Sequence, residues 1–337
     1  MAAKIFFFSR DVRTHNLFRG SWHRAVQEVG VDAIVICRGF GLKNVFISIF
    51  RFIFSTGQCR VLFGTSEICL YSLFSTNGDV WVFTGLGRLL LEEGYLARFV
   101  RSYLRSLYRG QRLVVLNEQD QKFMQEVFGS PPFLLNGEGY QFSINSSEHK
   151  VSLNQRELTF AYVGRLLKSK GVDQLVSSFA KYSLDNWTLM VIGDSDFSNK
   201  DSMSLIELDR LGKLSKGKIL YTGFQKDVGA LINSADFLIS LSRREGLPFS
   251  VLDGIEAGLH IALSPVPGHL SFSDLPGVTF VKLGELGIFF ERVAHVPSQF
   301  LIFDRVKRIA ACREKFSREA VVEKIKQLLF DPTDKTL

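Results

Sequence analysis

The sequence predicts an α/β fold made of two facing Rossmann-like domains, each with a parallel sheet, and a cleft between them. Three observations support this prediction. The chain has 337 residues, enough for about two domains of roughly 150 residues each. Short apolar runs alternate with helix-like stretches, as in parallel sheets that helices cover on both faces. A polar stretch at residues 144–157 interrupts this rhythm and is typical of a linker.

Apolar runs on both sides of the linker are candidate strands. Before the linker they fall at residues 4–9, 32–38, 58–64, 79–85, 112–117 and 131–136. After the linker they fall at residues 158–164, 187–193, 218–223, 236–242, 260–265 and 277–281. We therefore expect an N-terminal domain over residues 1–143, a second domain over 158–296, and helices over 297–337 that pack back toward the first domain. Such sheets bind ligands beyond the carboxyl ends of their strands, which makes the cleft the expected site.

Composition and charge exclude several classes of protein. Hydrophobic residues make up 46% of the chain and charged residues 22%, which excludes a disordered chain. The cysteines form no Cys-x-x-Cys pair and the histidines no closely spaced pair, so we expect a reducing compartment and no zinc site. The net charge of +7 favours an anionic partner, such as nucleic acid, a membrane or a phosphorylated substrate. No nucleic-acid-binding module is found, so we expect no nucleic-acid partner.

The first candidate binding site lies just after the linker. In the stretch AYVGRLLKSKGVDQLVSSF (161–179) a strand ends at Gly164, a short loop contains Arg165 and Lys170, and a helix starts near Gly171. Helix amides, the helix dipole and two cations together suit a diphosphate. A solvated basic loop would give the same pattern and stays open as the alternative.

The second candidate site lies in the stretch SRREGLPFSVLDGIEAG (242–258). Glu245 and Gly246 follow a predicted strand, and Pro248 lies near the start of the next helix, where proline is tolerated. If that helix continues to Asp253, about two turns beyond Glu245, both carboxylates can reach one ligand. The alternative for Glu245 is an exposed loop carboxylate.

These stretches resemble the retaining glycosyltransferases of glycosyltransferase family 4. The resemblance rests on the order and spacing of VGRLLKSKGVDQLV, VIGD, YTGF, SADFLISLS and REGLPFSVLDGIEAG, within residues 157–281. It implies the GT-B fold and a hexosyltransferase that moves a sugar from a UDP- or GDP-linked donor to a glycan or polyprenyl-diphosphate-linked acceptor. The implied pathway is surface-polysaccharide synthesis, of O-antigen, capsule or exopolysaccharide. A non-catalytic nucleotide-sugar-binding or scaffold subunit and an epimerase of the same fold stay open as alternatives.

The resemblance also implies roles for individual residues. Arg165 and Lys170 would bind the donor diphosphate, and Glu245 would hold hydroxyls of the donor sugar with help from the amides of Gly246 and Leu247. The candidate catalytic residues are Glu245, Arg165 and Lys170. The implied donor-binding set is Gly164, Arg165, Lys170, Gly193, Asp194, Gly223, Phe224, Glu245, Gly246, Leu247 and Asp253.

Two positions depart from the family pattern. Asp253 stands where the family has a glutamate that contacts the ribose, so its reach is shorter, and Glu256 is the alternative contact. A Gly-Asp-Ser sequence at 193–195 replaces the family's Gly-Asp-Gly turn. Asp194 and Asp196 also form an Asp-x-Asp string, which binds metal in the other glycosyltransferase fold, but here it follows a strand where the family has its glycine turn.

The implied reaction has clear electrostatic requirements. Cleavage of the sugar–phosphate bond develops negative charge on the leaving diphosphate, and fixed cations with aligned amides stabilise such charge. We therefore expect no metal, and no cofactor besides the nucleotide sugar as co-substrate. Retention of configuration raises the question of a nucleophile, and the sequence offers no convincing one. The resemblance implies a front-face route, in which the leaving phosphate takes the acceptor's proton.

The first domain resembles the family only weakly, through the string FTGLGRLL. Relatives have a paired-glycine loop after the first strand, whereas residues 9–20 carry a lone Gly20. Gly85, Gly87 and Arg88 lie between a predicted strand and a helix, where an anion-binding turn can form. We expect them to meet the phosphate end of a lipid-linked acceptor or to line the acceptor cleft. A tight turn that needs glycine is the alternative.

The basic excess is concentrated in the first part of the chain. Residues 1–150 hold 17 Lys and Arg against 12 Asp and Glu, and the rest of the chain holds 24 against 22. Arg98, Arg101, Arg105 and Arg109 line one face of a predicted amphipathic helix, as on a peripheral membrane surface. We therefore expect peripheral association with the anionic inner leaflet of the cytoplasmic membrane, on the cytoplasmic side. A core-packed helix with a solvated arginine face is the alternative.

Residues 44–55 (NVFISIFRFIFS) form the most apolar window. The window contains Arg51 and is too short to span a bilayer, which takes about 20 residues. A shallow membrane-inserting helix is one interpretation of this window, and burial in the core is the one we expect.

Overall fold

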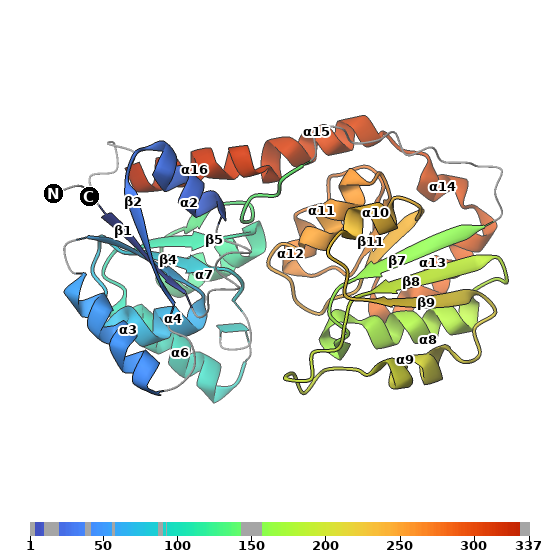
Figure 1. Cartoon of the computed structure of the whole chain (residues 1–337), viewed down its shortest axis with the longest axis horizontal. Coiled ribbons are helices and arrows are strands. Elements are labelled where there is room, and N and C mark those ends of the chain that lie inside the picture. The colour runs from blue at the N-terminus through green and yellow to red at the C-terminus, as the bar shows by residue number, and fades with distance from the viewer. Residues whose placement is uncertain are drawn as a thin grey trace. The chain divides into compact units, whose positions relative to one another are not determined.

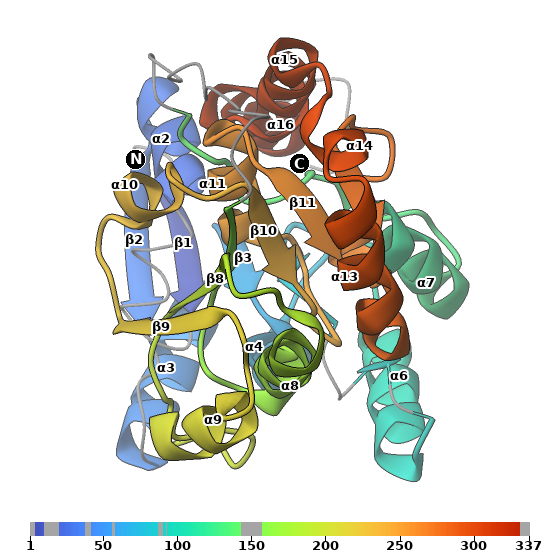
Figure 2. The same cartoon turned by 90° about the vertical axis from the view of Figure 1, so that its right-hand side faces the viewer.

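The computed structural model describes residues 4–9, 20–37, 42–55, 58–86, 90–91, 93–142 and 157–330 (Figures 1 and 2). The chain divides into two compact units: unit 1 is Met1–Gln141 with Glu314–Leu337, and unit 2 is Phe142–Arg313. Of the predicted linker, only Glu157 is among the described residues. Each unit contains a six-stranded sheet whose neighbouring strands are parallel, which confirms the predicted pair of Rossmann-like domains.

The sheet of unit 1 has the strand order β2-β1-β3-β4-β5-β6. Its strands are β1 (Lys4–Ser9), β2 (Asp32–Cys37), β3 (Cys59–Phe63), β4 (Val80–Phe83), β5 (Arg112–Val115) and β6 (Phe133–Leu134). Each strand falls within one of the runs predicted from the sequence. The central strand β4 reads Val-Trp-Val-Phe and is buried along its whole length, because helices cover both faces of the sheet.

Helices pack on both faces of the unit 1 sheet (Figure 1). On one face, α2 (Gly20–Glu28) and α16 (Arg318–Phe330) pack around the buried Trp22, and an ion pair joins the two helices. The other face is packed around Trp81. Its helices are α3 (Leu42–Phe54), α4 (Thr65–Tyr71), the 3-10 helix η1 (Ser72–Phe74), α6 (Tyr95–Leu107) and α7 (Glu118–Phe128). Through α16, the last part of the described chain belongs to the core of unit 1.

The sheet of unit 2 has the strand order β12-β11-β10-β7-β8-β9. Its strands are β7 (Leu158–Val163), β8 (Trp187–Ile192), β9 (Lys218–Gly223), β10 (Phe237–Ser240), β11 (His260–Leu263) and β12 (Val278–Phe280). These also fall within the predicted runs. One face of the sheet carries a cluster of packed aromatic side chains, which accounts for part of the high phenylalanine content. The cluster includes Phe160, Phe179, Trp187, Phe237 and Phe290.

The helices of unit 2 lie on both sides of its sheet. Those that contribute to the ring-bearing core are α8 (Val172–Tyr182), α9 (Leu205–Gly212), α13 (Leu286–His295) and α14 (Ser298–Leu301). The others are α10 (Val228–Ile232), α11 (Phe249–Glu256), α12 (Pro267–Leu270), α15 (Arg305–Phe316) and the 3-10 helices η2 (Lys168–Lys170) and η3 (Leu283–Glu285). The boundary between the two units falls within α15.

The structure corrects the prediction that residues 44–55 are buried in the core. They lie mostly in α3, where Phe46, Phe50 and Phe54 are exposed and Phe52 is buried. The prediction is wrong because the buried side of α3 carries small polar residues, Ser48 and, directly after the helix, Ser55, beside Phe52, while its most apolar side faces outward.

The arginine-rich helix also differs from the predicted one. α6 ends at Leu107, so Arg109 lies beyond the helix. Arg101 is half-buried and donates a hydrogen bond to the Leu90 carbonyl (2.6 Å), whereas Arg98 and Arg105 are exposed. None of the helices in the described ranges combines the length and the apolar character that crossing a bilayer requires.

Candidate functional site

Three neighbouring strands of unit 2 end in glycine at one edge of the sheet. β7, β8 and β9 lie side by side, and Gly164, Gly193 and Gly223 stand at their carboxyl ends. The Gly164 amide donates to the Ile192 carbonyl (3.0 Å) and the Gly193 amide to the Gly223 carbonyl (2.9 Å). Gly193 has a φ of 147°, and a Cβ there would lie 1.8 Å from the Gly164 carbonyl oxygen. The edge therefore depends on a close backbone approach that only glycine permits.

Arg165 follows β7 and lies at the surface of this edge. Its carbonyl accepts a hydrogen bond from the Tyr162 hydroxyl (2.7 Å), and its Nη1 lies 2.8 Å from Asp196 Oδ2. The Ser198 hydroxyl donates to the other oxygen of Asp196 (2.6 Å). Hydrogen bonds from Ser198 and Arg165 hold the pKa of Asp196 below its usual value, so this carboxylate is charged. The Arg165 side chain is 60% exposed, which leaves it accessible to a ligand.

Lys170 and Glu245 form an ion pair at the same edge, although they are 75 residues apart in the chain. Lys170 Nζ lies 2.5 Å from Glu245 Oε1, which also accepts a hydrogen bond from Ser242 Oγ (2.6 Å). The two side chains are 24% and 16% exposed. Water competes less with a partly buried pair than with a surface pair. The structure thus brings together two residues that the sequence assigned to one ligand.

The loops that carry this ion pair are bonded to each other. The Arg243 amide donates to the Ser169 carbonyl (2.8 Å), which joins the loop after β10 to the loop after β7. The Ser169 amide donates in turn to Asp201 Oδ2 (2.8 Å). Lys170 directly precedes Gly171, the N-cap of α8, where the helix dipole has its positive end. An anion bound at this edge would therefore lie near both Lys170 and the positive end of the α8 dipole.

The start of α12 contacts the turn at Glu245 and Gly246. The Gly268 amide donates to the Glu245 carbonyl (3.1 Å). A Cβ at Gly268 would lie 2.4 Å from the Gly246 carbonyl oxygen, so a larger residue would displace the turn. The position of the Glu245 carboxylate therefore depends on a backbone contact from a separate helix.

His269 is a buried polar residue close to the ion pair. Its Nδ1 donates to the Ser264 carbonyl (2.8 Å), which leaves Nε2 to accept from Ser240 Oγ (3.2 Å). Burial lowers the pKa of His269, so the ring is neutral. Sequence reasoning missed His269, together with Ser242 and Gly268. The signal for α12 was the Val266–Pro267 pair directly after an apolar run.

The remaining candidates of the second stretch lie on or next to α11. Gly246 and Leu247 are half-buried in the turn that precedes the helix. α11 runs from Phe249 to Glu256 and includes Asp253, so the helix does continue as far as the sequence argument required. Asp253 and its alternative Glu256 are both half-buried. The helix N-terminus at this position favours negative charge in the ligand.

Asp194 and Phe224 are both exposed, just beyond the glycine ends of β8 and β9. Asp194 accepts a hydrogen bond from the Ser195 amide (2.8 Å), and Asp196 is already engaged by Arg165 and Ser198. Within the described residues, no group of three or more His, Cys, Asp or Glu side chains is arranged to hold a metal ion.

The candidate acceptor residues of unit 1 are placed only in part. Gly85 follows β4 and is half-buried. Gly87 and Arg88 lie outside the described residues, as does the loop between Ser9 and Gly20.

Sequence reasoning missed a polar pair at the carboxyl end of β5. Asn117 caps α7: its Oδ1 accepts from the Asp120 amide (2.8 Å) and its Nδ2 donates to Asp120 Oδ2 (3.0 Å). Burial raises the pKa of Asp120 to about 6, and the Asn117 hydrogen bond opposes this rise. The sequence signal is that of an ordinary helix N-cap, so nothing in it marked the carboxyl group as unusual.

Comparison with known proteins connects this geometry to a family. Residues 144–272 match the family model of glycosyl transferases group 1, a span that contains all the candidate donor residues. The chain is 25% identical over 201 residues to the N,N'-diacetylbacillosaminyl-diphospho-undecaprenol alpha-1,3-N-acetylgalactosaminyltransferase of Campylobacter jejuni, covering 55% of this chain and 51% of that protein. It is also 25% identical over 243 residues to the UDP-Gal:alpha-D-GlcNAc-diphosphoundecaprenol alpha-1,3-galactosyltransferase of Escherichia coli, covering 65% and 60%. The chain thus spans between half and two thirds of the length of these relatives.

Solved structures resemble the chain over nearly its whole length. Anabaena HepE in complex with UDP has a TM-score of 0.71 at 14% identity, covering 97% of this chain and 99% of HepE. The lipopolysaccharide outer core galactosyltransferase WaaB has a TM-score of 0.70 at 14% identity, with the same coverage. At this level of identity the likeness establishes the fold.

Proposed function

We propose that this chain, which has the GT-B fold and carries a group 1 glycosyltransferase domain, transfers a hexose-type sugar from a nucleotide-sugar donor to a glycan or lipid-linked acceptor. The observation that carries the proposal is the Lys170–Glu245 ion pair, which lies among glycine turns and helix N-termini at one sheet edge. A cation and a carboxylate held side by side suit two parts of one ligand. The cation suits the anionic diphosphate, and the carboxylate suits the hydroxyls of the sugar.

Each half of the ion pair has a distinct role in donor binding. Lys170 and Arg165 bind the diphosphate, together with the positive end of the α8 dipole. Oε1 of Glu245 is engaged by Lys170 and Ser242, and Oε2 forms no hydrogen bond to any described residue. Oε2 is therefore the oxygen that accepts from hydroxyls of the donor sugar. When the donor enters, Lys170 contacts carboxylate and phosphate together, so the pair need not separate.

The same groups stabilise the charge that develops during transfer. As the sugar–phosphate bond breaks, negative charge grows on the leaving diphosphate, where Lys170, Arg165 and the amides of Gly246 and Leu247 face it. A phosphate oxygen takes the proton of the acceptor hydroxyl while the new glycosidic bond forms on the same face of the sugar. Configuration is then retained, and no metal is required because fixed cations carry the electrostatic role.

The names of relatives support particular classes of donor and acceptor. The E. coli relative is named for a UDP-galactose donor, and Anabaena HepE was solved with UDP-glucose, which favours a UDP-linked donor over a GDP-linked one. Both curated relatives are named for diphospho-undecaprenol acceptors. We infer an acceptor that is a polyprenyl-diphosphate-linked glycan in surface-polysaccharide synthesis, and a peripheral location at the cytoplasmic face of the membrane.

Nucleotide release tests this proposal. A panel of UDP- and GDP-linked sugars is first screened for a rise in the thermal midpoint, and the stabilising donor is then incubated with a detergent-dispersed polyprenyl-diphosphate glycan. We expect one donor to release its nucleotide only when the acceptor is present. Binding without release would instead identify the non-catalytic subunit, which the departure at Asp253 favours. Conversion of the donor without acceptor would identify an epimerase.

A further inference from the structure

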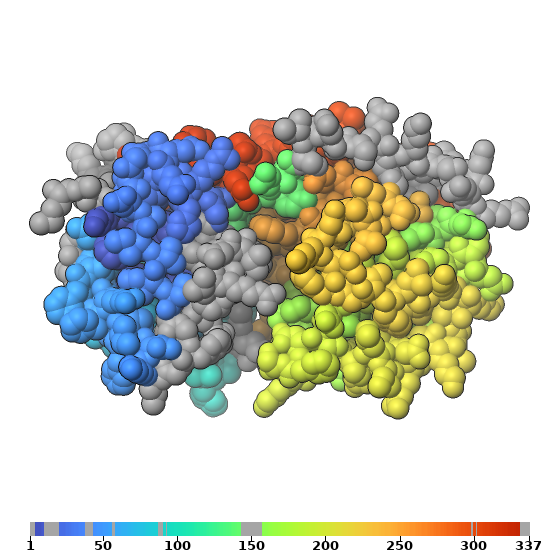
Figure 3. Space-filling view, in the orientation of Figure 1, coloured from blue at the N-terminus to red at the C-terminus, as the bar shows by residue number. Residues whose placement is uncertain are grey.

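α3 of unit 1, whose atoms lie at the lower left of Figure 3, has several solvent-exposed aromatic side chains. Phe46, Phe50 and Phe54 are 71%, 62% and 72% exposed, and Ile47 and Ile53 are exposed beside them. Residues four apart share one side of a helix, so the three phenylalanines form one stripe. The rings of Phe50 and Phe54 lie with their centroids 4.2 Å apart. Contiguous exposed apolar surface of this kind marks an interaction site.

The outward orientation of this stripe is fixed from the core side. Phe52 is buried, and the Arg60 guanidinium lies 4.1 Å from its ring centroid and donates to its carbonyl (3.2 Å). Arg60 is itself buried in a bidentate ion pair with Asp79, at 2.7 Å for both contacts. Nearer the start of α3, the Tyr71 hydroxyl donates to Ser48 Oγ (2.8 Å). Rolling α3 would remove the Phe52 carbonyl and ring from the buried Arg60 guanidinium, which is unfavourable.

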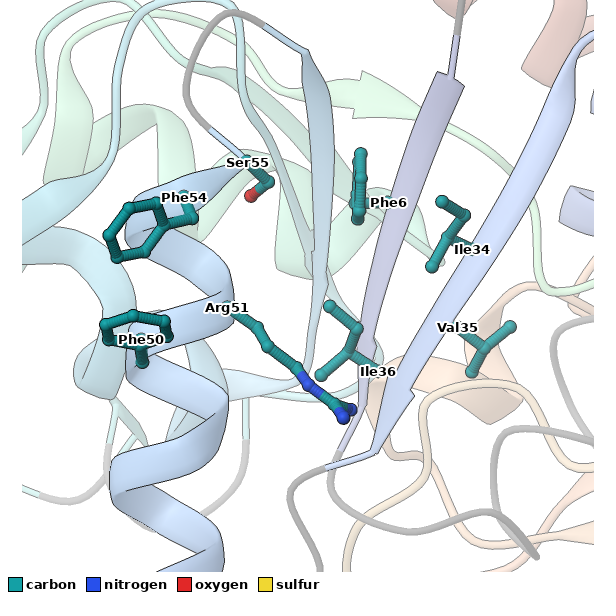
Figure 4. Close-up of a pocket in the computed structure, with 8 residues that line it drawn as sticks. All are labelled: Phe6, Ile34, Val35, Ile36, Phe50, Arg51, Phe54 and Ser55. Carbon is teal, nitrogen blue, oxygen red and sulfur yellow. The ribbon is translucent and has the colours of Figure 1, made fainter.

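An apolar groove of about 350 Å³ continues the stripe toward the edge of the sheet (Figure 4). Phe50 and Phe54 form its helix wall, and the opposite wall comes from β1 and the edge strand β2, with Ile34 and Val35 among its residues. Arg51 reaches from α3 across the groove toward β2. The apolar area thus extends beyond the helix and has a cation within it.

η1 and α6 expose further apolar side chains of unit 1. Figure 2 shows α3 and α6 apart, with α4 between them, and a hydrogen bond from Ser72 Oγ to the Tyr103 hydroxyl (3.4 Å) joins η1 to α6. Exposed apolar side chains of these elements are Leu73, Phe74, Tyr95, Leu96 and Phe99.

The charged side chains of α3 and α6 are all basic. Lys43 and Arg51 of α3 and Arg98 and Arg105 of α6 are exposed, and none of the four pairs with a carboxylate among the described residues. Neither helix contains Asp or Glu. A partner of these helices must therefore offer both apolar and anionic groups, as a leaflet with anionic headgroups does. A second copy of the chain would place cations against cations, which is unfavourable.

We propose that α3 inserts its Phe46–Phe50–Phe54 stripe into an anionic lipid leaflet, lying in the plane of the membrane interface. The aromatic rings and the groove enter the boundary between headgroups and acyl chains, and the flanking cations contact headgroup phosphates. Arg51 can contact both regions, because the aliphatic part of its side chain lies along the groove while its guanidinium can contact headgroup phosphates. This inference deepens the proposed peripheral location and rests on it, but it does not depend on the transfer reaction.

A tryptophan probe tests insertion directly. The native residues Trp22, Trp81 and Trp187 are at most 1% exposed, so Phe50→Trp adds a solvent-exposed indole to a buried background. With vesicles of phosphatidylcholine and phosphatidylglycerol that carry brominated acyl chains, we expect the emission of Phe50→Trp to shift to the blue and to be quenched. Leu214→Trp, at an 88% exposed site of unit 2, is the matched control and should show neither effect.

A serine variant measures the contribution of the stripe to binding. Replacing Phe46, Phe50 and Phe54 together by serine should lower vesicle partitioning by more than about tenfold, with the thermal midpoint unchanged because all three side chains are exposed. Omitting phosphatidylglycerol should weaken binding of the unaltered chain.

An unquenched Phe50→Trp indole, or a triple variant that still binds fully, would overturn the inference. Loss of a dimer in the triple variant, without any vesicle binding by the unaltered chain, would overturn it in favour of a second copy. Nucleotide release with a detergent-dispersed acceptor needs no vesicle. Failure of the proposed sugar transfer and failure of membrane insertion are therefore measured in separate assays.

Discussion

The sheet edge of unit 2 and the α3 surface of unit 1 offer ligands two different kinds of contact. At the edge, a few polar groups are held at fixed positions, as in the 2.5 Å contact between Lys170 and Glu245. On α3, apolar rings such as Phe46 and Phe54 are exposed to solvent. The first arrangement suits one small ligand with a defined geometry, and the second suits a fluid surface. Substitutions should therefore act through geometry in unit 2 and through area and charge in unit 1.

The largest expected effect comes from breaking the ion pair. Lys170→Ala or Glu245→Ala should lower kcat/KM for nucleotide release by about 10²–10³-fold, because each removes a fixed group that faces the donor. The thermal midpoint should change little, because both side chains retain some exposure and the remaining partner stays partly hydrated. Lys282→Ala removes an exposed lysine that pairs with Glu285 at 3.6 Å and is the matched control. Unfolding of either site variant would contradict the assigned binding role and indicate a structural one.

A glycine pair tests whether unit 2 depends on backbone geometry. Gly193→Ala should lower the free energy of unfolding by about 3 kcal/mol, because its Cβ would collide with the Gly164 carbonyl. Gly223→Ala should cost only about 1 kcal/mol, since its φ of 68° disfavours alanine but the space around it is open. Urea titration measures both values. Equal losses would show that the close approach at Gly193 is not the constraint.

Acid should act on the two units in opposite directions. Burial lowers the pKa of His260 to about 4, so between pH 6.5 and 4.5 unfolded unit 2 binds more protons than folded unit 2. Its free energy of unfolding should fall by about 2 kcal/mol as pH falls through this window, and the lowered pKa of His269 acts in the same direction. In unit 1 the raised pKa of Asp120, about 6, makes the folded state bind more protons and raises stability over the same window, while the pKa of His23, lowered by burial, acts against this rise.

Native-state hydrogen exchange separates these two responses. Amides of β11 report on unit 2 and amides of β5 on unit 1, once intrinsic exchange rates are corrected for pH. His260→Gln should remove most of the response of unit 2, and Asp120→Asn that of unit 1. A common response of both strands would mean that the units unfold together.

The sequence was most informative where function and chain order coincide. Gly164 and Gly193 directly follow apolar runs, so their places at strand ends could be predicted from the runs alone. Lys170 and Glu245 follow strands that turn out to be neighbours in the sheet, which explains why two separate stretches form one site. His269 could not be found in this way, because it acts from beneath the site through contacts that leave no distinctive spacing.

The orientation of α3 could not be predicted for a different physical reason. Its sequence FISIFRFIF is apolar both at alternate positions and at helical spacing, so periodicity does not distinguish a strand from a helix. Within the helix, the most apolar side, with Phe46, Phe50 and Phe54, is the exposed one, so apolar character does not indicate which side is buried. The orientation of α3 depends instead on the buried pair of Arg60 and Asp79, because Arg60 also donates a hydrogen bond to the Phe52 carbonyl. Such a pair is a tertiary contact, and nothing in the local pattern of α3 records it.

The smallest expected effect distinguishes arginines within α6. Arg98→Ala and Arg105→Ala should each weaken binding to phosphatidylglycerol-containing vesicles by about fivefold, since a cation near an anionic leaflet contributes about 1 kcal/mol. Arg101→Ala is the matched control, because this side chain is half-buried and donates to the Leu90 carbonyl. It should lower the thermal midpoint slightly and leave vesicle binding nearly unchanged. Flotation assays at low and high salt measure the difference, which should disappear at high salt because surface charges are then screened. If all three variants bound alike, α6 would lie away from the leaflet, and the membrane surface of unit 1 would be confined to α3 and its groove.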